Sequence, residues 1–158
     1  MLVGEQPGDR EDRAGEPFVG PAGAVLERAL EEAGLDRGDI YVTNAVKHFK
    51  WKAGRGKRRL HQRPNAEELS ACRPWLESEL AVVRPRALVC LGATAAHALL
   101  GPSVRIGRDR GRPLESELAP LTTVTAHPAS ILRIPEDRER RRARAELATD
   151  LRRVREGI

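Results

Sequence analysis

Apolar and polar positions follow one another along the chain in blocks that predict parallel strands separated by helices. Short, nearly continuous apolar runs are typical of buried parallel strands. They cover Met1–Val3, Ile40–Val46 and Ala87–Leu91, and a last strand is predicted over Leu121–Ala126. Apolar residues at helical spacing occur in Pro21–Leu35, Ala66–Val83, Ala93–Leu100 and Glu136–Arg155. Since at least one helical stretch separates each strand from the next, we expect a parallel sheet covered by helices on both faces.

Polar residues follow three of these strands. The first strand ends in the motif GEQPG at residues 4–8, where proline removes a ladder donor and the glycines admit unusual backbone angles. Asn44 and His127 lie at the ends of two later strands. Because the carboxyl ends of parallel strands meet at one edge, where open α/β sheets bind ligands, we expect a site there. The alternative for residues 4–23 is an ordinary acidic, Gly/Pro-rich surface loop.

A second loop, residues 47–64, is basic and contains no acidic residue. Its sequence, KHFKWKAGRGKRRLHQRP, includes all the lysines of the chain and two aromatic residues. Cations interleaved with aromatic rings are typical of loops that bind nucleic acid. The alternative is a solvated basic connection. A third segment, 101–120, lacks periodicity and offers further candidates for phosphate contacts, namely Arg105, Arg108, Arg110 and Arg112.

The length and composition indicate one globular domain. A chain of 158 residues can bury a real core, and its net charge of +5 agrees with an anionic partner without requiring one. The two cysteines, Cys72 and Cys90, make no disulfide framework, and Cys90 inside an apolar strand is most simply a small buried hydrophobe. No stretch resembles a signal peptide or a membrane span, so we expect a cytoplasmic monomer without membrane contact.

Three motifs in order, GEQPG at 4–8, KRRLH at 57–61 and HPASILR at 127–133, resemble the uracil-DNA glycosylase superfamily. Within it, the chain is most similar to the iron-sulfur family 4 and, closest of all, to the UdgX type. The resemblance covers nearly the whole chain. It implies a three-layer αβα sandwich with a central four-stranded parallel sheet, a single domain over residues 1–158, and excision of uracil from DNA, with single-stranded DNA preferred.

The resemblance also implies roles for the residues at the strand ends. It places Glu5 and Gln6 beside the glycosidic bond, with Gln6 also lining the uracil pocket. It makes Phe18 the aromatic that stacks on the flipped base, Asn44 the amide that binds the pyrimidine edge, and His127 a donor to a uracil carbonyl. A base inside a duplex must be extruded before it can be held in this way. Uracil leaves as an anion, so a donor such as His127 stabilises charge that develops as the bond breaks.

In the UdgX type the loop histidine, here His61, is understood to capture C1′ of the sugar, so that protein and DNA become covalently joined. This step needs a neutral imidazole, and Glu5 is the candidate to stabilise the sugar cation and to orient or deprotonate His61. The predicted phosphate contacts are Lys50, Lys52, Lys57, Arg58, Arg59 and Arg133. The alternative for His61 is a loop histidine without a chemical role.

The family resemblance further implies a 4Fe-4S cluster. Cys72 and His48 occupy ligand positions, but the Cys-x-x-Cys that the family carries near its amino terminus is absent. We therefore expect that the amino-terminal segment is missing and that the cluster is incomplete or absent. The alternatives are Cys72 as helix core and His48 as a base-contacting loop residue. Two rival functions remain open: a hydrolytic family-4 glycosylase, and a non-catalytic nucleic-acid-binding module.

Overall fold

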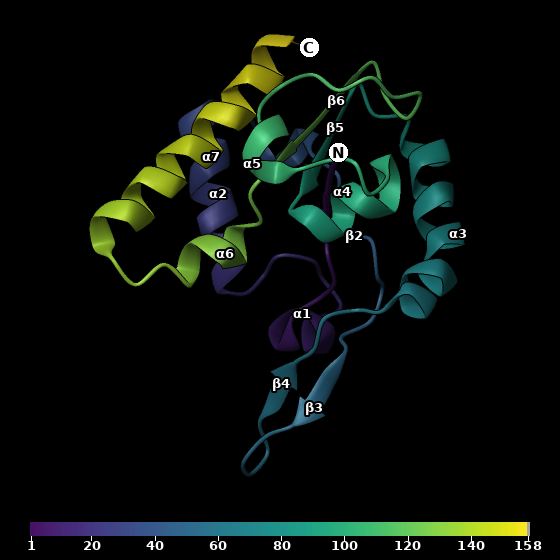
Figure 1. The fold of residues 1–158 in the computed structure, drawn as a ribbon, viewed down its shortest axis with the longest axis vertical. Coiled ribbons are helices and arrows are strands. Elements are labelled where there is room, and N and C mark those ends of the chain that lie inside the picture. Colours follow the sequence, from purple (N-terminus) through teal and green to yellow (C-terminus); the bar gives the residue numbers. More distant parts are fainter. Residues whose placement is uncertain (158) are drawn as a thin grey trace.

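The computed structural model describes residues 1–157, and these form a three-layer αβα sandwich (Figure 1). Four parallel strands of the described chain make the central sheet in the order β2-β1-β5-β6. Their bounds are β1 Leu2–Gly4, β2 Val42–Asn44, β5 Ala87–Leu91 and β6 Leu121–Thr125. The register pairs Gly4 with Asn44 and Leu91 with Thr125, so the carboxyl ends of the strands align at one edge. The predicted parallel sheet is confirmed, although β2 is shorter than expected.

One face of the sheet is covered by α2 (Pro21–Ala33), α6 (Pro128–Leu132) and α7 (Asp137–Gly157). The helices α2 and α7 lie side by side (Figure 1), and the buried residues of α2 belong to the core on this face. The core on this side combines alternate strand residues with helix residues, among them Leu2, Val89, Leu91, Leu26, Leu30, Ile131, Leu147 and Leu151. Within residues 1–157, no helix is both long and apolar enough to cross a membrane.

The opposite face is covered by α3 (Ala66–Val83) and α4 (Ala93–Leu100), with the bounds that the sequence predicts. Strand residues that alternate with the first set, such as Val3, Leu88 and Cys90, form the second core. Burial raises the pKa of the Cys90 thiol to about 12, which fits its predicted part as a small buried hydrophobe. The start of α3 is a capping box, in which Asn65 and Glu68 bind each other's backbone N–H groups.

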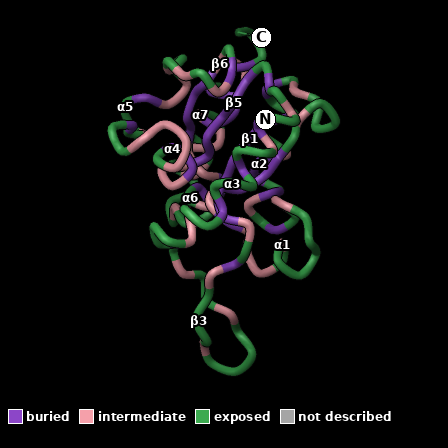
Figure 2. Tube along the Cα trace, turned by 90° about the vertical axis from the view of Figure 1, so that its right-hand side faces the viewer, coloured by how far each residue is buried: buried purple, intermediate pink, exposed green. Residues whose placement is uncertain are grey.

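Four short elements lie in segments that the sequence predicts as loops. They are α1 (Asp9–Ala14), the strands β3 (Trp51–Ala53) and β4 (Arg59–His61), and α5 (Ile106–Asp109); a 3-10 turn, η1 (Arg37–Asp39), precedes β2. The strands β3 and β4 pair antiparallel and form a hairpin that projects from the sandwich, and its tip is exposed (Figures 1 and 2). The sequence shows no apolar periodicity that would predict this hairpin, because most of its residues face solvent.

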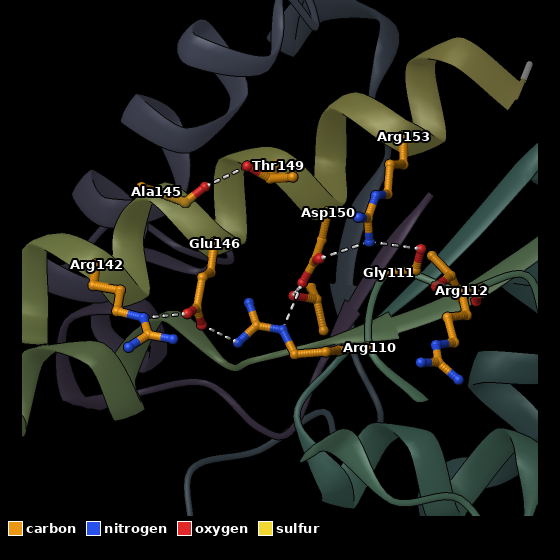
Figure 3. A network of polar contacts seen from close by, with 11 residues as sticks. Arg110, Gly111, Arg112, Arg142, Ala145, Glu146, Thr149, Asp150 and Arg153 are labelled. Carbon is orange, nitrogen blue, oxygen red and sulfur yellow. Dashed lines mark hydrogen bonds and ion pairs between the residues drawn. The ribbon is translucent and has the colours of Figure 1, made fainter. Parts of the chain in front are cut away.

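A buried carboxylate ties α7 to the last strand. Asp150 Oδ2 accepts hydrogen bonds from Thr125 Oγ1 at 2.6 Å and from Arg110 Nε at 2.9 Å. Figure 3 shows Arg110 between Asp150 and Glu146, whose Oε2 lies 2.8 Å from Arg110 Nη1. Arg108 is likewise paired, with Asp109. These two arginines therefore form ion pairs within the fold, and phosphate contacts by their segment stay a prediction.

Candidate active site

The carboxyl ends of the strands and the loops that follow them enclose a cavity of about 1090 Å³. The expected convergence of polar strand ends is confirmed, since the cavity is lined by Glu5, Asn44 and His127, which lie at or just after the ends of β1, β2 and β6. Those that matter most for chemistry are Glu5, Gln6, Phe18, Asn44, His61, Arg63, Thr94, His127 and Arg133. Their individual roles stay predictions, which the geometry below makes specific.

His127 presents an unpaired donor in this wall. Its Nδ1 accepts a hydrogen bond from Ala129 N at 3.1 Å, so the neutral ring carries its proton on Nε2. Burial, the largest cause, lowers the pKa of His127 to about 4, and the ring is therefore neutral at pH 7. Nε2 is buried and has no partner among the described residues. A buried N–H left unpaired costs free energy, which a ligand acceptor would recover.

Asn44, at the end of β2, presents the complementary acceptor. The residue is 5 % exposed, and within the described chain its Oδ1 has no hydrogen-bond donor. Next to it, Lys47 Nζ binds the Asn44 carbonyl oxygen at 2.8 Å and Glu79 Oε2 at 2.6 Å, which fixes the end of β2 to α3. The cavity thus contains one buried acceptor and one buried donor that the protein itself leaves unsatisfied.

Phe18 lies beside these two groups in an unusual backbone conformation. Its ring centroid is 5.7 Å from that of His127, with 31° between the planes. Its φ of 57° is unfavourable for a bulky residue and is typical of functional sites. Gly4 makes room for it, because a Cβ there would lie 2.8 Å from Phe18 Cζ and 2.4 Å from Asn44 Oδ1. Gly23 is equally constrained, since its Cβ would meet the Phe18 carbonyl oxygen at 1.7 Å.

Glu5 brings the basic hairpin and the sheet edge together. Its Oε1 lies 3.3 Å from His61 Nε2, and its Oε2 lies 3.9 Å from Arg63 Nε. Thr94 Oγ1 donates a hydrogen bond to Oε2. The Glu5 side chain is only 21 % exposed, whereas His61 is 45 % exposed. A carboxylate held from one side therefore faces an imidazole that a substrate can reach.

Two contributors to this arrangement were not predicted. Thr94 lies in the first turn of α4 and orients Glu5, which is 89 residues away in the chain. Glu11 accepts a hydrogen bond from Gly20 N at 2.7 Å and closes the loop that carries Phe18. The signal for Thr94 in the sequence is its place two residues after Gly92, the glycine that follows β5.

Gln6 holds the base of the hairpin. Its Nε2 donates to the carbonyl oxygens of Gln62 at 2.9 Å and Lys50 at 3.4 Å, and its Oε1 accepts from Lys50 N at 3.2 Å. The side chain is buried, and these bonds use both ends of the amide. Although Gln6 lines the cavity, its amide is committed to positioning the loop that carries His61.

The predicted phosphate contacts fall into two groups. Arg59 forms ion pairs with Asp9 and, at 2.6 Å, with Asp12, and its side chain is 17 % exposed. Lys50 Nζ lies 2.8 Å from Glu68 Oε2. These two cations fasten the hairpin to α1 and α3. The other four are exposed and have no ion pair among residues 1–157: Lys52, Lys57, Arg58 and Arg133.

The two predicted cluster ligands are neighbours. Cys72 Sγ lies 3.8 Å from His48 Nδ1 and also accepts a hydrogen bond from Lys47 N at 3.4 Å. Across residues 1–157, however, no group of three or more Cys, His, Asp or Glu residues could hold a metal ion. The described residues therefore provide two adjacent candidate ligands, which do not amount to a 4Fe-4S site.

Comparison with known proteins gives a consistent result. The model of the uracil DNA glycosylase superfamily matches residues 1–152. The type-4 uracil-DNA glycosylase of Pyrobaculum aerophilum is 37% identical over 142 residues, which cover 85% of this chain and 68% of that protein. The type-4 uracil-DNA glycosylase of Thermotoga maritima is 36% identical, and the alignment covers 84% of this chain and 66% of that protein. That of Archaeoglobus fulgidus is also 36% identical, and the alignment covers 88% of this chain and 69% of that protein. The chain thus spans about two thirds of these relatives. It belongs to the uracil DNA glycosylase superfamily.

Proposed function

We propose that this protein excises uracil from DNA and then becomes covalently joined to the abasic sugar through His61. The observation that carries the proposal is the pair of unsatisfied buried atoms, Asn44 Oδ1 and His127 Nε2, in one cavity with the Glu5–His61 pair. Family membership supports the uracil-excision part of the proposal, and so do the type-4 uracil-DNA glycosylases among the relatives, whereas the joining step rests on the Glu5–His61 geometry.

The two unsatisfied atoms match the edge of uracil. Uracil presents a donor at N3 flanked by carbonyl acceptors, so Asn44 Oδ1 can accept from N3–H while His127 Nε2–H donates to a carbonyl. Cytosine carries an acceptor at N3, which would leave Oδ1 buried and unpaired at a cost of about 1–3 kcal/mol. Phe18 adds a stacking surface for the extruded base, worth about 1–3 kcal/mol.

Bond cleavage develops charge on both fragments. As the C1′–N1 bond breaks, its electron pair leaves with uracil, and the negative charge spreads to the carbonyl oxygens. A neutral His127, whose buried Nε2–H has no partner within the described chain, stabilises this charge by donating a hydrogen bond. The sugar becomes an oxocarbenium-like cation, which the Glu5 carboxylate stabilises electrostatically.

His61 then competes with water for the cation. Glu5 Oε1 lies 3.3 Å from His61 Nε2 and accepts the proton of that nitrogen, while the unprotonated Nδ1 supplies the lone pair that forms the bond to C1′. The products are an N-glycosylated His61, a protonated Glu5 and the uracil anion, which is protonated in turn. Gln6 supports the step by fixing the backbone of Gln62, the residue after His61. No step of this mechanism passes through a cluster.

The test compares the parent protein with His61→Ser and Glu5→Gln on single-stranded DNA that contains one uracil. Denaturing gels run before and after alkali, together with an assay of free uracil, separate the products. The parent should release uracil and leave a detergent-stable protein–DNA band. His61→Ser should release uracil without the band and leave an alkali-labile abasic site, because water enters the vacated space. Glu5→Gln should slow band formation, since an amide accepts no proton.

His97→Ser is the matched control, because this exposed histidine of α4 lies outside the cavity wall. It should retain the band in full. A band from His61→Ser would identify another nucleophile and refute the trapping step. Uracil release by the parent without any band would support the hydrolytic alternative. The absence of uracil release from every form would leave a nucleic-acid-binding module.

A further inference from the structure

The hairpin places Trp51 directly opposite His61. The register pairs these two residues, and the flanking hydrogen bonds, Gln62 N to Lys50 O and Gly54 N to Arg58 O, make them a non-hydrogen-bonded pair. Side chains of such a pair share one face of the ribbon, with Cβ atoms about 4.5–5.5 Å apart. Trp51 is thus the nearest cross-strand neighbour of the residue that contacts Glu5.

The large aromatic side chain of Trp51 is partly exposed to solvent and is also in contact with a neighbouring side chain. The residue is 46 % exposed, although tryptophan is usually much more buried. The Arg59 guanidinium lies 5.6 Å from the ring centroid, and the ion pairs of Arg59 with Asp9 and Asp12 hold that guanidinium in place. The indole therefore has a fixed support and a large solvent-facing surface.

The surroundings of this surface favour an anionic, base-bearing partner. Residues 47–64 contain no acid, and the exposed cations Lys57 and Arg58 lie at the tip of the same hairpin, while Lys52 follows Trp51 in β3 and faces the other side of the ribbon. A positive groove with an aromatic platform is the arrangement by which proteins hold single-stranded nucleic acid.

We infer that Trp51 is a stacking platform for the base of a nucleotide adjacent to the flipped uridine. The inference rests on the proposed function, since it takes His61 as the point at which C1′ is held. It assigns to the hairpin a second task besides phosphate binding. By stacking an unpaired neighbouring base, Trp51 fixes the strand beside the cavity and favours single-stranded over duplex DNA, in which that base is already stacked and paired.

The composition of the chain allows a direct test. It has two tryptophans, so Trp75→Phe leaves Trp51 as the only indole, and Trp51→Phe leaves Trp75, which is 68 % exposed on α3. Each protein is titrated with a single-stranded oligonucleotide that carries 2′-fluoro-2′-deoxyuridine, a nucleotide resistant to cleavage. Fluorescence of the Trp75→Phe protein should be quenched on binding, whereas that of the Trp51→Phe protein should change little.

A double-mutant cycle then identifies the stacked base. Trp51→Ala should weaken binding about 5- to 150-fold, Trp51→Phe should restore most of the affinity, and Trp75→Ala should match the parent. The same titrations are repeated with an abasic residue on the 5′ or the 3′ side of the uridine analogue. At the stacked position the effect of Trp51→Ala should largely disappear, since the interaction has already been removed.

Two results would overturn the inference: unquenched Trp51 fluorescence in the saturated complex, or an undiminished Trp51→Ala effect with both abasic substrates. The second result would indicate a general effect on the hairpin instead of stacking. Uracil release by the parent on cleavable DNA is scored separately. Its absence would refute the proposed function, whereas its presence together with a strictly additive cycle would refute only the stacking assignment.

Discussion

Unfolding measured against pH should reveal His127 as a buried, neutral imidazole. Its pKa is about 4 in the folded protein and 6.5 in the reference state, with burial as the largest cause of the difference. As the pH falls below 6.5, the unfolded chain binds the proton while the folded protein does not. The contribution of His127 to stability is therefore present above pH 6.5 and is lost progressively as the pH falls toward 4.

The size of the effect follows from the two pKa values. They differ by about 2.5, and each unit corresponds to 1.36 kcal/mol, so the full contribution is about 3 kcal/mol. Between pH 7.5 and pH 4.5, the parent should lose about 2 to 3 kcal/mol of unfolding free energy through this residue alone. Other histidines and the carboxylates add their own pH dependence, which a matched variant removes by subtraction.

His127→Asn is the appropriate variant. His127 is the N-cap of α6, and asparagine also accepts a hydrogen bond from the backbone there, but it does not titrate. Urea unfolding at several pH values measures the free energy of unfolding. As the pH falls, this free energy should decrease less for His127→Asn than for the parent, whatever the difference in stability between the two proteins at pH 7.5. His97→Asn, at an exposed helical histidine, should follow the parent.

The reasoning would be refuted if the free energy of unfolding decreased equally with falling pH in His127→Asn and in the parent. The same conclusion would follow if the His127 ring resonances, observed by NMR, titrated near pH 6.5. Either result would mean that the ring is not desolvated as described.

Two further predictions concern binding. Phe18→Ala should weaken binding of uracil DNA about 5- to 150-fold, because the stacking of the base on the ring is lost. Asn44→Ala should reduce discrimination between uracil and cytosine more than it reduces general DNA affinity. Unchanged uracil excision by both variants would mean that the base binds elsewhere. Replacing Lys57 and Arg58 with alanine should flatten the dependence of log K on log salt by about 0.7 per lost contact on single-stranded DNA, with Arg141→Ala on α7 as the control. A slope equal to that of the parent would exclude the hairpin tip from the DNA interface.

Several features follow from local sequence, because they depend on periodicity or on neighbouring residues. The buried strand β5 is a continuous apolar run, and α3 has an asparagine as its N-cap with a glutamate three residues later. Parallel topology then requires the polar ends of β1, β2 and β6 to meet at one edge. The sequence thereby predicted that Glu5, Asn44 and His127 would gather, even though they are far apart in the chain.

Other features depend on contacts that no local pattern records. The hairpin and α1 stabilise each other through Arg59, Asp9 and Asp12, which are separated by about 50 residues, so neither segment shows a core-facing periodicity. The sequence indicated Gln6 as a pocket residue, and it does line the cavity; the hydrogen bonds of its amide to the loop backbone are known only from the structure.

The orientation of Glu5 and the protonation state of His127 also depend on tertiary structure alone. Thr94 orients Glu5, and burial keeps His127 neutral with an unpaired N–H. A sequence specifies which groups are present and which elements carry them. The distance between two such groups, and the water removed from around them, arise only when the elements pack together.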